Sequence, residues 1–177
     1  MMLQLPKRVV IIGPESTGKS TLCAALAEKT GEPWVPEYAR TYLENLGRPY
    51  RYEDLLEIAK GQVGEEDKMA MLADRMLFCD TDLHVIKIWS EHKYGHTDPW
   101  IEKEIARREY HLYLLTDIDM PWEPDPQREY PDPVMRKYFY DWYESILKGT
   151  GIPLVKITGT KEKRLDKAYR AVQEILG

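Results

Sequence analysis

The stretch Gly13-Pro14-Glu15-Ser16-Thr17-Gly18-Lys19-Ser20 decides how this chain folds. Two glycines that flank four residues and precede Lys-Ser let backbone N–H groups curl around phosphate oxygens, and a following helix adds its positive N-terminal end. A β-branched run at 8–12 comes before the stretch, and helical spacing at 19–29 comes after it. Strand, loop and helix in this order predict a phosphate-binding loop, or P-loop.

The loop chemistry predicts a role for each part of the motif. We expect Lys19 to reach the terminal phosphates of ATP, and the Ser20 hydroxyl to ligate Mg²⁺. A glycine-rich turn without a ligand is the alternative. The predicted ATP-binding residues are Gly13, Pro14, Glu15, Ser16, Thr17, Gly18, Lys19, Ser20 and Thr21.

Strand-like and helical patterns alternate along the rest of the chain. Short apolar runs lie at 34–38, 76–80, 111–116 and 154–158, and helical patterns lie at 41–46, 52–75, 83–92, 100–108, 133–147 and 161–176. This alternation predicts an α/β, three-layer P-loop kinase fold with a five-stranded, mostly parallel sheet and helices on both faces. Ligands then bind at the carboxyl edge of the sheet. A length of 177 residues suits a single domain over 1–177.

The segment 117–132 interrupts the alternation with four prolines, at positions 121, 124, 126 and 131. Prolines this dense exclude a helix or a central strand, and a loop of this length is typical of a lid. We expect Arg128 to cover ATP and stabilise the charge of the moving phosphoryl group, with Trp122 and Asp125 close to the substrate. Arg136 either shares this role or is an exposed arginine on the following helix.

Acidic residues follow the strand predicted at 76–80. Asp80 comes directly after the apolar run, where a P-loop enzyme needs a carboxylate near its magnesium ion. Asp80 either holds the metal or accepts the proton of an attacking hydroxyl group. Asp82 either serves as that base or caps the next helix.

The second predicted strand ends in Glu37-Tyr38-Ala39-Arg40. A carboxylate at Glu37 suits a ribose diol, and Arg40 suits a phosphate or orients Glu37. Trp34, Tyr38 or Tyr42 suits stacking on an aromatic base. In the alternative, the charged pair is a solvated salt bridge and the aromatics belong to the core.

Gly61-Gln62 lies inside a long helical pattern. Glycine in a helix costs roughly 1 kcal/mol relative to alanine, so a close approach by substrate or by another helix would explain it. Gln62 is included among the predicted substrate-binding residues.

Composition excludes several classes of protein. A net charge of −5 gives no general attraction to nucleic acid or to an anionic membrane. No apolar run approaches the roughly 20 residues of a membrane span, so we expect a cytoplasmic protein whose partner is a small molecule. Cys23 and Cys79 lack metal spacing and are expected to be reduced core residues.

Taken together, the P-loop, Glu37-Tyr38-Ala39-Arg40, Gly61-Gln62, Asp80-Thr81-Asp82, Tyr94-Gly95 and the segment from Trp122 to Arg128 resemble the NadR-type ribosylnicotinamide kinase domain. The resemblance implies ATP-dependent phosphorylation of the ribose 5'-hydroxyl of nicotinamide riboside, which gives nicotinamide mononucleotide for NAD synthesis. Where family members usually place ring-binding aromatics, this chain has Val35-Pro36-Glu37, and Trp34 is the candidate substitute.

Two other functions are compatible with these motifs. One is a kinase for another nucleoside or a nucleotide. The other is a regulatory P-loop NTPase switch without a small-molecule acceptor. Rapid ADP release only in the presence of an acceptor distinguishes a kinase from a switch.

Overall fold

Five parallel strands form one sheet in the computed structural model, which describes residues 5–177. The spatial order is β2-β3-β1-β4-β5, and every neighbouring pair is parallel. After β1 the chain fills one side of the sheet with β2 and β3, then crosses to the other side for β4 and β5, so β1 ends at the topological switch point where α/β folds bind ligands. The strands are β1 (Lys7–Ile12), β2 (Trp34–Val35), β3 (Met76–Asp80), β4 (Leu112–Thr116) and β5 (Leu154–Ile157).

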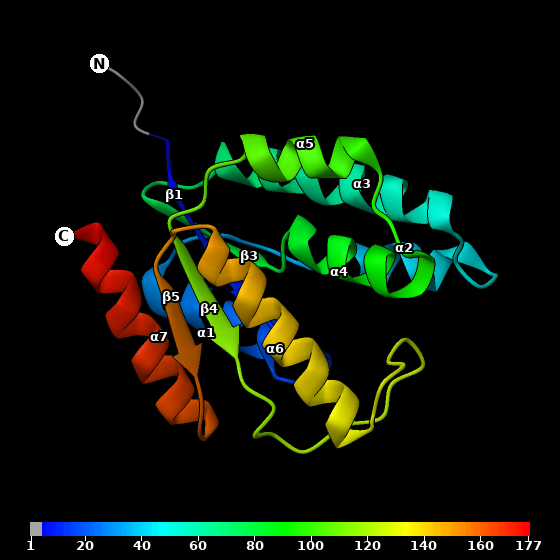
Figure 1. The fold of residues 1–177 in the computed structure, drawn as a ribbon. Coiled ribbons are helices and arrows are strands. Elements are labelled where there is room, and N and C mark those ends of the chain that lie inside the picture. The colour runs from blue at the N-terminus through cyan, green and yellow to red at the C-terminus, as the bar shows by residue number, and fades with distance from the viewer. Residues whose placement is uncertain (1–4) are drawn as a thin grey trace.

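Helices cover both faces of this sheet. In Figure 1, α6 lies in front of the sheet and α1 behind it, with α7 beside α1. Alternate residues of β1 belong to the apolar cores on the two faces of the sheet. Val9 and Ile11 pack with α1 and α7, whereas Val10 and Ile12 pack with α4 and α6. The helices are α1 (Lys19–Thr30), α2 (Tyr38–Leu46), α3 (Tyr52–Ala70), α4 (Leu83–Tyr94), α5 (Pro99–Arg107), α6 (Pro133–Gly149) and α7 (Lys161–Leu176).

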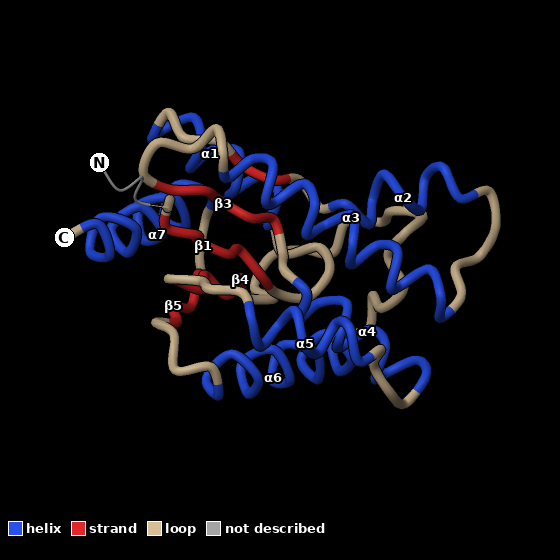
Figure 2. Tube along the Cα trace, turned by 90° about the horizontal axis from the view of Figure 1, so that it is seen from above, coloured by secondary structure: helices blue, strands red, loops and turns tan. Residues whose placement is uncertain are grey.

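A third apolar cluster joins helices α2 to α5 beyond the sheet, where Figure 2 shows α2 and α3 reaching outward. The segment between β4 and α6 runs along the edge to which the strands of Figure 1 point. This is the edge at which the alternation of strands and helices predicts that ligands bind.

The predicted α/β fold class is confirmed, and two element boundaries were wrong. The second strand stops at Val35 rather than at residue 38 because Pro36 has no N–H to continue the ladder, and Tyr38 already begins α2. Helix α3 ends at Ala70 rather than near residue 75, because the Glu32 carboxylate accepts the backbone N–H groups of Asp74 and Arg75 at 3.1 and 3.0 Å. Both cysteines are free and buried, which confirms the prediction for them.

The unusual glycine at position 61 is explained by a neighbouring helix. A Cβ atom on Gly61 would lie 2.0 Å from Cε1 of the Tyr38 ring, which starts α2. The adjacent Gln62 accepts the Tyr38 backbone N–H through Oε1 at 2.9 Å. Gly61-Gln62 therefore joins α3 to α2.

We expect Gly61→Ala to lower the free energy of unfolding by up to about 2 kcal/mol, because the overpacking cost of about 1–3 kcal/mol offsets or exceeds the helix-propensity gain of about 1 kcal/mol. Gly64→Ala on the same helix is the matched control: a Cβ atom there would meet nothing within 4 Å, so it should stabilise the protein by about 0.5–1 kcal/mol. Urea denaturation measures both changes. Equal stabilisation by the two substitutions would contradict the packing explanation.

Candidate active site

The P-loop takes its shape from contacts with the end of β4. Gly13 has φ +155°, and a Cβ atom there would lie 2.5 Å from Oγ1 of Thr116, so no other residue fits without a shift. The Thr17 hydroxyl is buried, lies 2.8 Å from the Pro14 carbonyl oxygen and shares a 2.7 Å hydrogen bond with the Thr116 hydroxyl. The loop is therefore held in place through the sheet itself.

A cleft of about 180 Å³ opens above the P-loop. Lys19 lies at its floor, where its Nζ donates to the Pro14 carbonyl oxygen at 2.8 Å. Ser20 donates its hydroxyl hydrogen to Oδ2 of Asp80 at 2.5 Å. The second carboxylate oxygen of Asp80, Oδ1, is buried and has no hydrogen-bond partner among residues 5–177.

The surroundings of Asp80 fit a magnesium ion that is bound together with a nucleotide. Burial raises the pKa of Asp80, against the opposing effects of Lys19 and of the Ser20 hydrogen bond. An unpartnered carboxylate oxygen beside a serine hydroxyl offers the hard oxygen ligands that Mg²⁺ prefers. Bound there, Mg²⁺ would supply neutralisation of phosphate charge.

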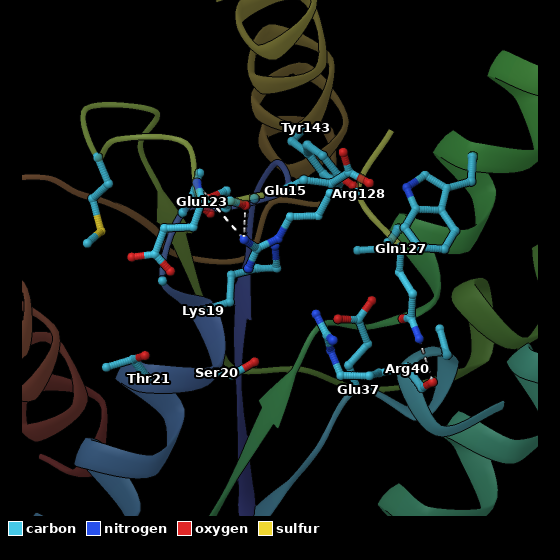
Figure 3. Close-up of a pocket in the computed structure, with 18 of the residues that line it drawn as sticks. Glu15, Lys19, Ser20, Thr21, Glu37, Arg40, Glu123, Gln127, Arg128 and Tyr143 are labelled. Carbon is cyan, nitrogen blue, oxygen red and sulfur yellow. Dashed lines mark hydrogen bonds between the residues drawn. The ribbon is translucent and has the colours of Figure 1, made fainter. Parts of the chain in front are cut away.

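Glu37 lines the same cleft as Lys19, from the N-cap position of α2. Burial raises its pKa to about 7, the nearby Asp80 carboxylate adds to the rise, and Lys19 and Arg40 oppose it. Figure 3 shows Glu37 and Arg40 across the cleft from Lys19 and Ser20. The cleft thus combines the P-loop at one end with a carboxyl group whose pKa is raised to about 7.

Asp82 caps helix α4 and is not among the residues that line the cleft. Its carboxylate accepts the His84 backbone N–H at 2.9 Å, and its Oδ2 lies 2.8 Å from both His84 Nδ1 and the Tyr113 hydroxyl. Burial alone would raise the pKa of Asp82, but His84 and Tyr113 outweigh that effect and lower the pKa. The helix-cap interpretation is confirmed, and this geometry gives the alternative base role no support.

The segment 117–132, hereafter the lid, lies over the P-loop. The Ser16 hydroxyl accepts the backbone N–H of Glu123 at 2.9 Å. The Glu15 carboxylate accepts the backbone N–H groups of Glu129 and Tyr130 at 3.0 and 3.1 Å. Two P-loop side chains therefore hold the lid down.

The lid also positions two arginines. Arg128 lines the cleft and donates to the Ser16 hydroxyl at 3.4 Å and to the Glu123 carbonyl oxygen. Arg136 is buried and donates to the carbonyl oxygens of Met120 and Ser16 at 3.3 and 3.2 Å, so the alternative that it is an exposed arginine was wrong. The Trp122 ring packs near both guanidinium groups, with centroid distances of 6.0 and 5.6 Å.

Several predicted substrate contacts lie outside the residues that line this cleft. Trp34 packs against the core formed with α1 and α7, and Tyr38 packs against Gly61. Asp125 pairs with Arg40 at 3.0 Å and so connects the lid to α2. The predicted residues that do line the cleft are Gly13, Glu15, Ser16, Thr17, Gly18, Lys19, Ser20, Thr21, Glu37, Arg40 and Arg128.

Two helices bring to the cleft aromatic residues that the sequence did not predict there. Trp89 of α4 and Tyr143 of α6 both line the cleft. Trp89 also lines a neighbouring side hollow, together with Tyr50 and Tyr130. Their apolar helical spacing resembles that of core positions, so no local signal distinguishes them.

Comparison with known proteins agrees with this geometry. A family model described as AAA domain matches residues 8–164. The trifunctional NAD biosynthesis/regulator protein NadR of Escherichia coli (strain K12) is 29% identical over 178 residues, which cover 97% of this chain but 43% of the relative. The chain thus spans less than half of that protein, and the resemblance to NadR is confirmed.

Solved structures show the same fold. A NadR protein in complex with NR and one in complex with NAD and AMP-PNP each match with a TM-score of 0.80 and 24% identity, over 97% of this chain and 50% and 49% of theirs. Thymidylate kinase from Ehrlichia chaffeensis matches with a TM-score of 0.64 and 14% identity, over 98% of this chain and 100% of its own. The predicted P-loop kinase fold is confirmed. None of the helices within residues 5–177 has the length and apolar character needed to cross a membrane.

We expect Asp80→Asn to raise the magnesium concentration for half-maximal activity by about tenfold or more, because it removes a carboxylate beside the predicted metal position. Asp82→Asn is the control: it should lower stability without shifting the magnesium response, since Asp82 serves as a buried cap. Titration of activity with magnesium measures both effects. A shift in Asp82→Asn alone would reverse the two assignments.

Proposed function

We propose that this chain, which belongs to the AAA domain family and has the P-loop kinase fold, phosphorylates nicotinamide riboside. In this reaction the terminal phosphate of ATP is transferred to the ribose 5'-hydroxyl, which gives nicotinamide mononucleotide. Residues 1–177 act as one kinase domain in this proposal. The observation that carries it is the composition of a single cleft: Lys19 and Ser20 lie at one end, and Glu37 and Trp89 at the other.

The donor nucleotide has a base position next to its phosphates. A second cavity of about 260 Å³ lies between α1 and α7, and it shares Gly18 and Thr21 with the main cleft. Leu22, Ala25 and Leu165 give this cavity apolar walls, which suit an aromatic base. ATP with its phosphates on the P-loop would direct its base there.

Glu37 is the group best suited to accept the proton of the 5'-hydroxyl. Asp80 is already engaged with Ser20, and Asp82 is engaged with His84, whereas Glu37 faces the cleft with a pKa near neutrality. A base whose pKa lies near the working pH combines the correct protonation state with sufficient driving force. This gives Glu37 the base role that the sequence analysis gave to Asp80 or Asp82.

The basic groups of the P-loop and lid would stabilise the charge on the phosphoryl group. Lys19 and Arg128 now donate mainly to neutral oxygens, the Pro14 carbonyl and the Ser16 hydroxyl among them. Phosphoryl oxygens would replace these acceptors with stronger, charge-assisted ones. The closed lid would also exclude water that otherwise hydrolyses ATP.

The acceptor ring would pack on Trp89. The face of a tryptophan attracts a cation, and nicotinamide riboside carries a positively charged pyridinium. Glu15 and Glu129 add two carboxylates to the side hollow next to Trp89. That hollow measures about 20 Å³, so a ring that extends into it would require the lid to move.

We expect kcat/KM for nicotinamide riboside to exceed that for uridine, cytidine and adenosine several-fold, because a cation over an electron-rich ring gains about 0.5–2 kcal/mol. Trp89→Ala should remove this preference, and Trp34→Ala, whose ring packs in the core, should retain it. Coupled ADP release measures the rates. A better neutral substrate would overturn the nicotinamide assignment, and no stimulation by any nucleoside would favour the NTPase switch.

We expect kcat/KM to rise with pH through an apparent pKa of about 7 and then level off, because only the carboxylate form of Glu37 accepts a proton. Glu37→Gln should lose about 10²- to 10⁴-fold in rate together with this pH limb. Glu123→Gln, an exposed lid carboxylate beside the cleft, is the control and should retain the limb. A pH limb that persists in Glu37→Gln would assign the base elsewhere.

A further inference from the structure

One arginine joins three separate segments around the cavity between α1 and α7. Arg164 lies in α7 and is 3% exposed. Its Nε donates to the Gly159 carbonyl oxygen at 2.9 Å, and its Nη1 donates to the Thr17 carbonyl oxygen at 2.9 Å. Its Nη2 donates to the Asp117 carbonyl oxygen at 3.1 Å and to the Asp119 carboxylate.

Asp119 completes a closed ring of contacts. Its second oxygen, Oδ2, accepts the Gly159 backbone N–H at 2.6 Å, so Arg164, Asp119 and Gly159 each contact the other two. The three connected segments are the P-loop at Thr17, the start of the lid at Asp117, and the turn 158–160 before α7. The ring fixes the distance between them.

The position of this arginine is costly for the helix alone. A cation close to the N-terminus of α7 opposes the helix dipole, and a buried guanidinium needs most of its five N–H donors satisfied. An apolar residue would pack against α1 more simply. The hydrogen bonds to three segments therefore point to a role in placing those segments.

The same segments enclose the predicted position of the ATP base. The cavity is lined by Gly18 from the P-loop, Met120 from the lid and Lys161 after the turn, and Arg164 is itself part of its wall. In contrast, Arg164 is absent from the residues that line the cleft containing Glu37. Arg164 therefore contributes to the wall of the base cavity, which shares Gly18, Met120 and Lys161 with that cleft.

We propose that Arg164 is a positioning residue for the donor nucleotide. It sets the separation between the P-loop and the turn 158–160, so that the phosphates and the base of one ATP molecule fit both ends at once. The identity of this donor rests on the proposed function.

Calorimetric titration with three probes tests the inference without an acceptor. Binding of ATP depends on the phosphate position and the base position together. Tripolyphosphate probes the phosphate position alone, and adenosine probes the base position without phosphates. We expect Arg164→Met to weaken ATP binding by about tenfold or more, since it removes charge-assisted hydrogen bonds that hold the two ends in register, and to change tripolyphosphate and adenosine binding by less than about threefold. Arg164→Lys should recover part of the loss.

Arg170→Met, an exposed arginine on the same helix, is the matched control and should bind ATP like the parent. A purely structural role would lower the fraction of binding-competent protein and leave the dissociation constant unchanged, which would overturn the inference. Asp119→Ala keeps the test valid if Arg164→Met fails to fold, because it removes the carboxylate of the ring from a side chain that is 37% exposed.

Unchanged ATP affinity in Arg164→Met and Asp119→Ala would also overturn the positioning role, as would an equal loss of tripolyphosphate and ATP affinity. These outcomes leave the proposed kinase intact. A parent protein that binds no ATP would instead reject the proposed function and this inference with it.

Discussion

The site depends on where the carbonyl oxygens of the P-loop find their hydrogen bonds. A loop that directs its N–H groups toward phosphate must satisfy its carbonyls elsewhere in the protein. Here the Pro14 carbonyl accepts from Thr17 and Lys19, the Ser16 carbonyl from Arg136, and the Thr17 carbonyl from Arg164. Two buried arginines from α6 and α7 therefore satisfy carbonyl oxygens on the back of the loop, and they connect the loop to the helices that cover the sheet.

The charged side chains in the cleft are arranged so that bound ligands would change the balance between them. Burial raises the pKa of both the Glu37 and the Asp80 carboxyl groups, and the Asp80 carboxylate raises the pKa of Glu37 further. Lys19 and Arg40 offset part of this effect. A cation near Asp80 would favour its charged form, while phosphates on Lys19 would remove the compensation that Glu37 receives and strengthen it as a base.

The sequence was sufficient to predict a structural feature wherever the signal for that feature was local. The spacing of the P-loop glycines and the alternation of strands and helices identified the fold, and Glu37 and Arg128 do lie in the cleft. Trp34 did not follow the prediction because its pairing with Phe78 places both side chains on the α1 and α7 side of the sheet. Trp89 and Arg164 could not be identified, because their contacts come from segments distant in sequence that only the tertiary fold assembles.

The contacts at the donor side and at the acceptor side differ in strength, and this difference determines which side opens. On the donor side, the hydrogen bonds of Arg164 are buried in the protein interior. Breaking them would leave a buried charge without partners, which is costly. On the acceptor side, the lid contacts α2 through the Arg40–Asp125 pair, whose arginine is 44% exposed, and such pairs contribute only about 0–1 kcal/mol. Local opening follows the weakest contacts, so the lid should detach from α2 and admit the acceptor while the base cavity stays formed. In the proposed kinase, ATP would then bind a preformed site, and closure over the acceptor would be the step that brings Arg128 and Glu37 to opposite sides of one substrate.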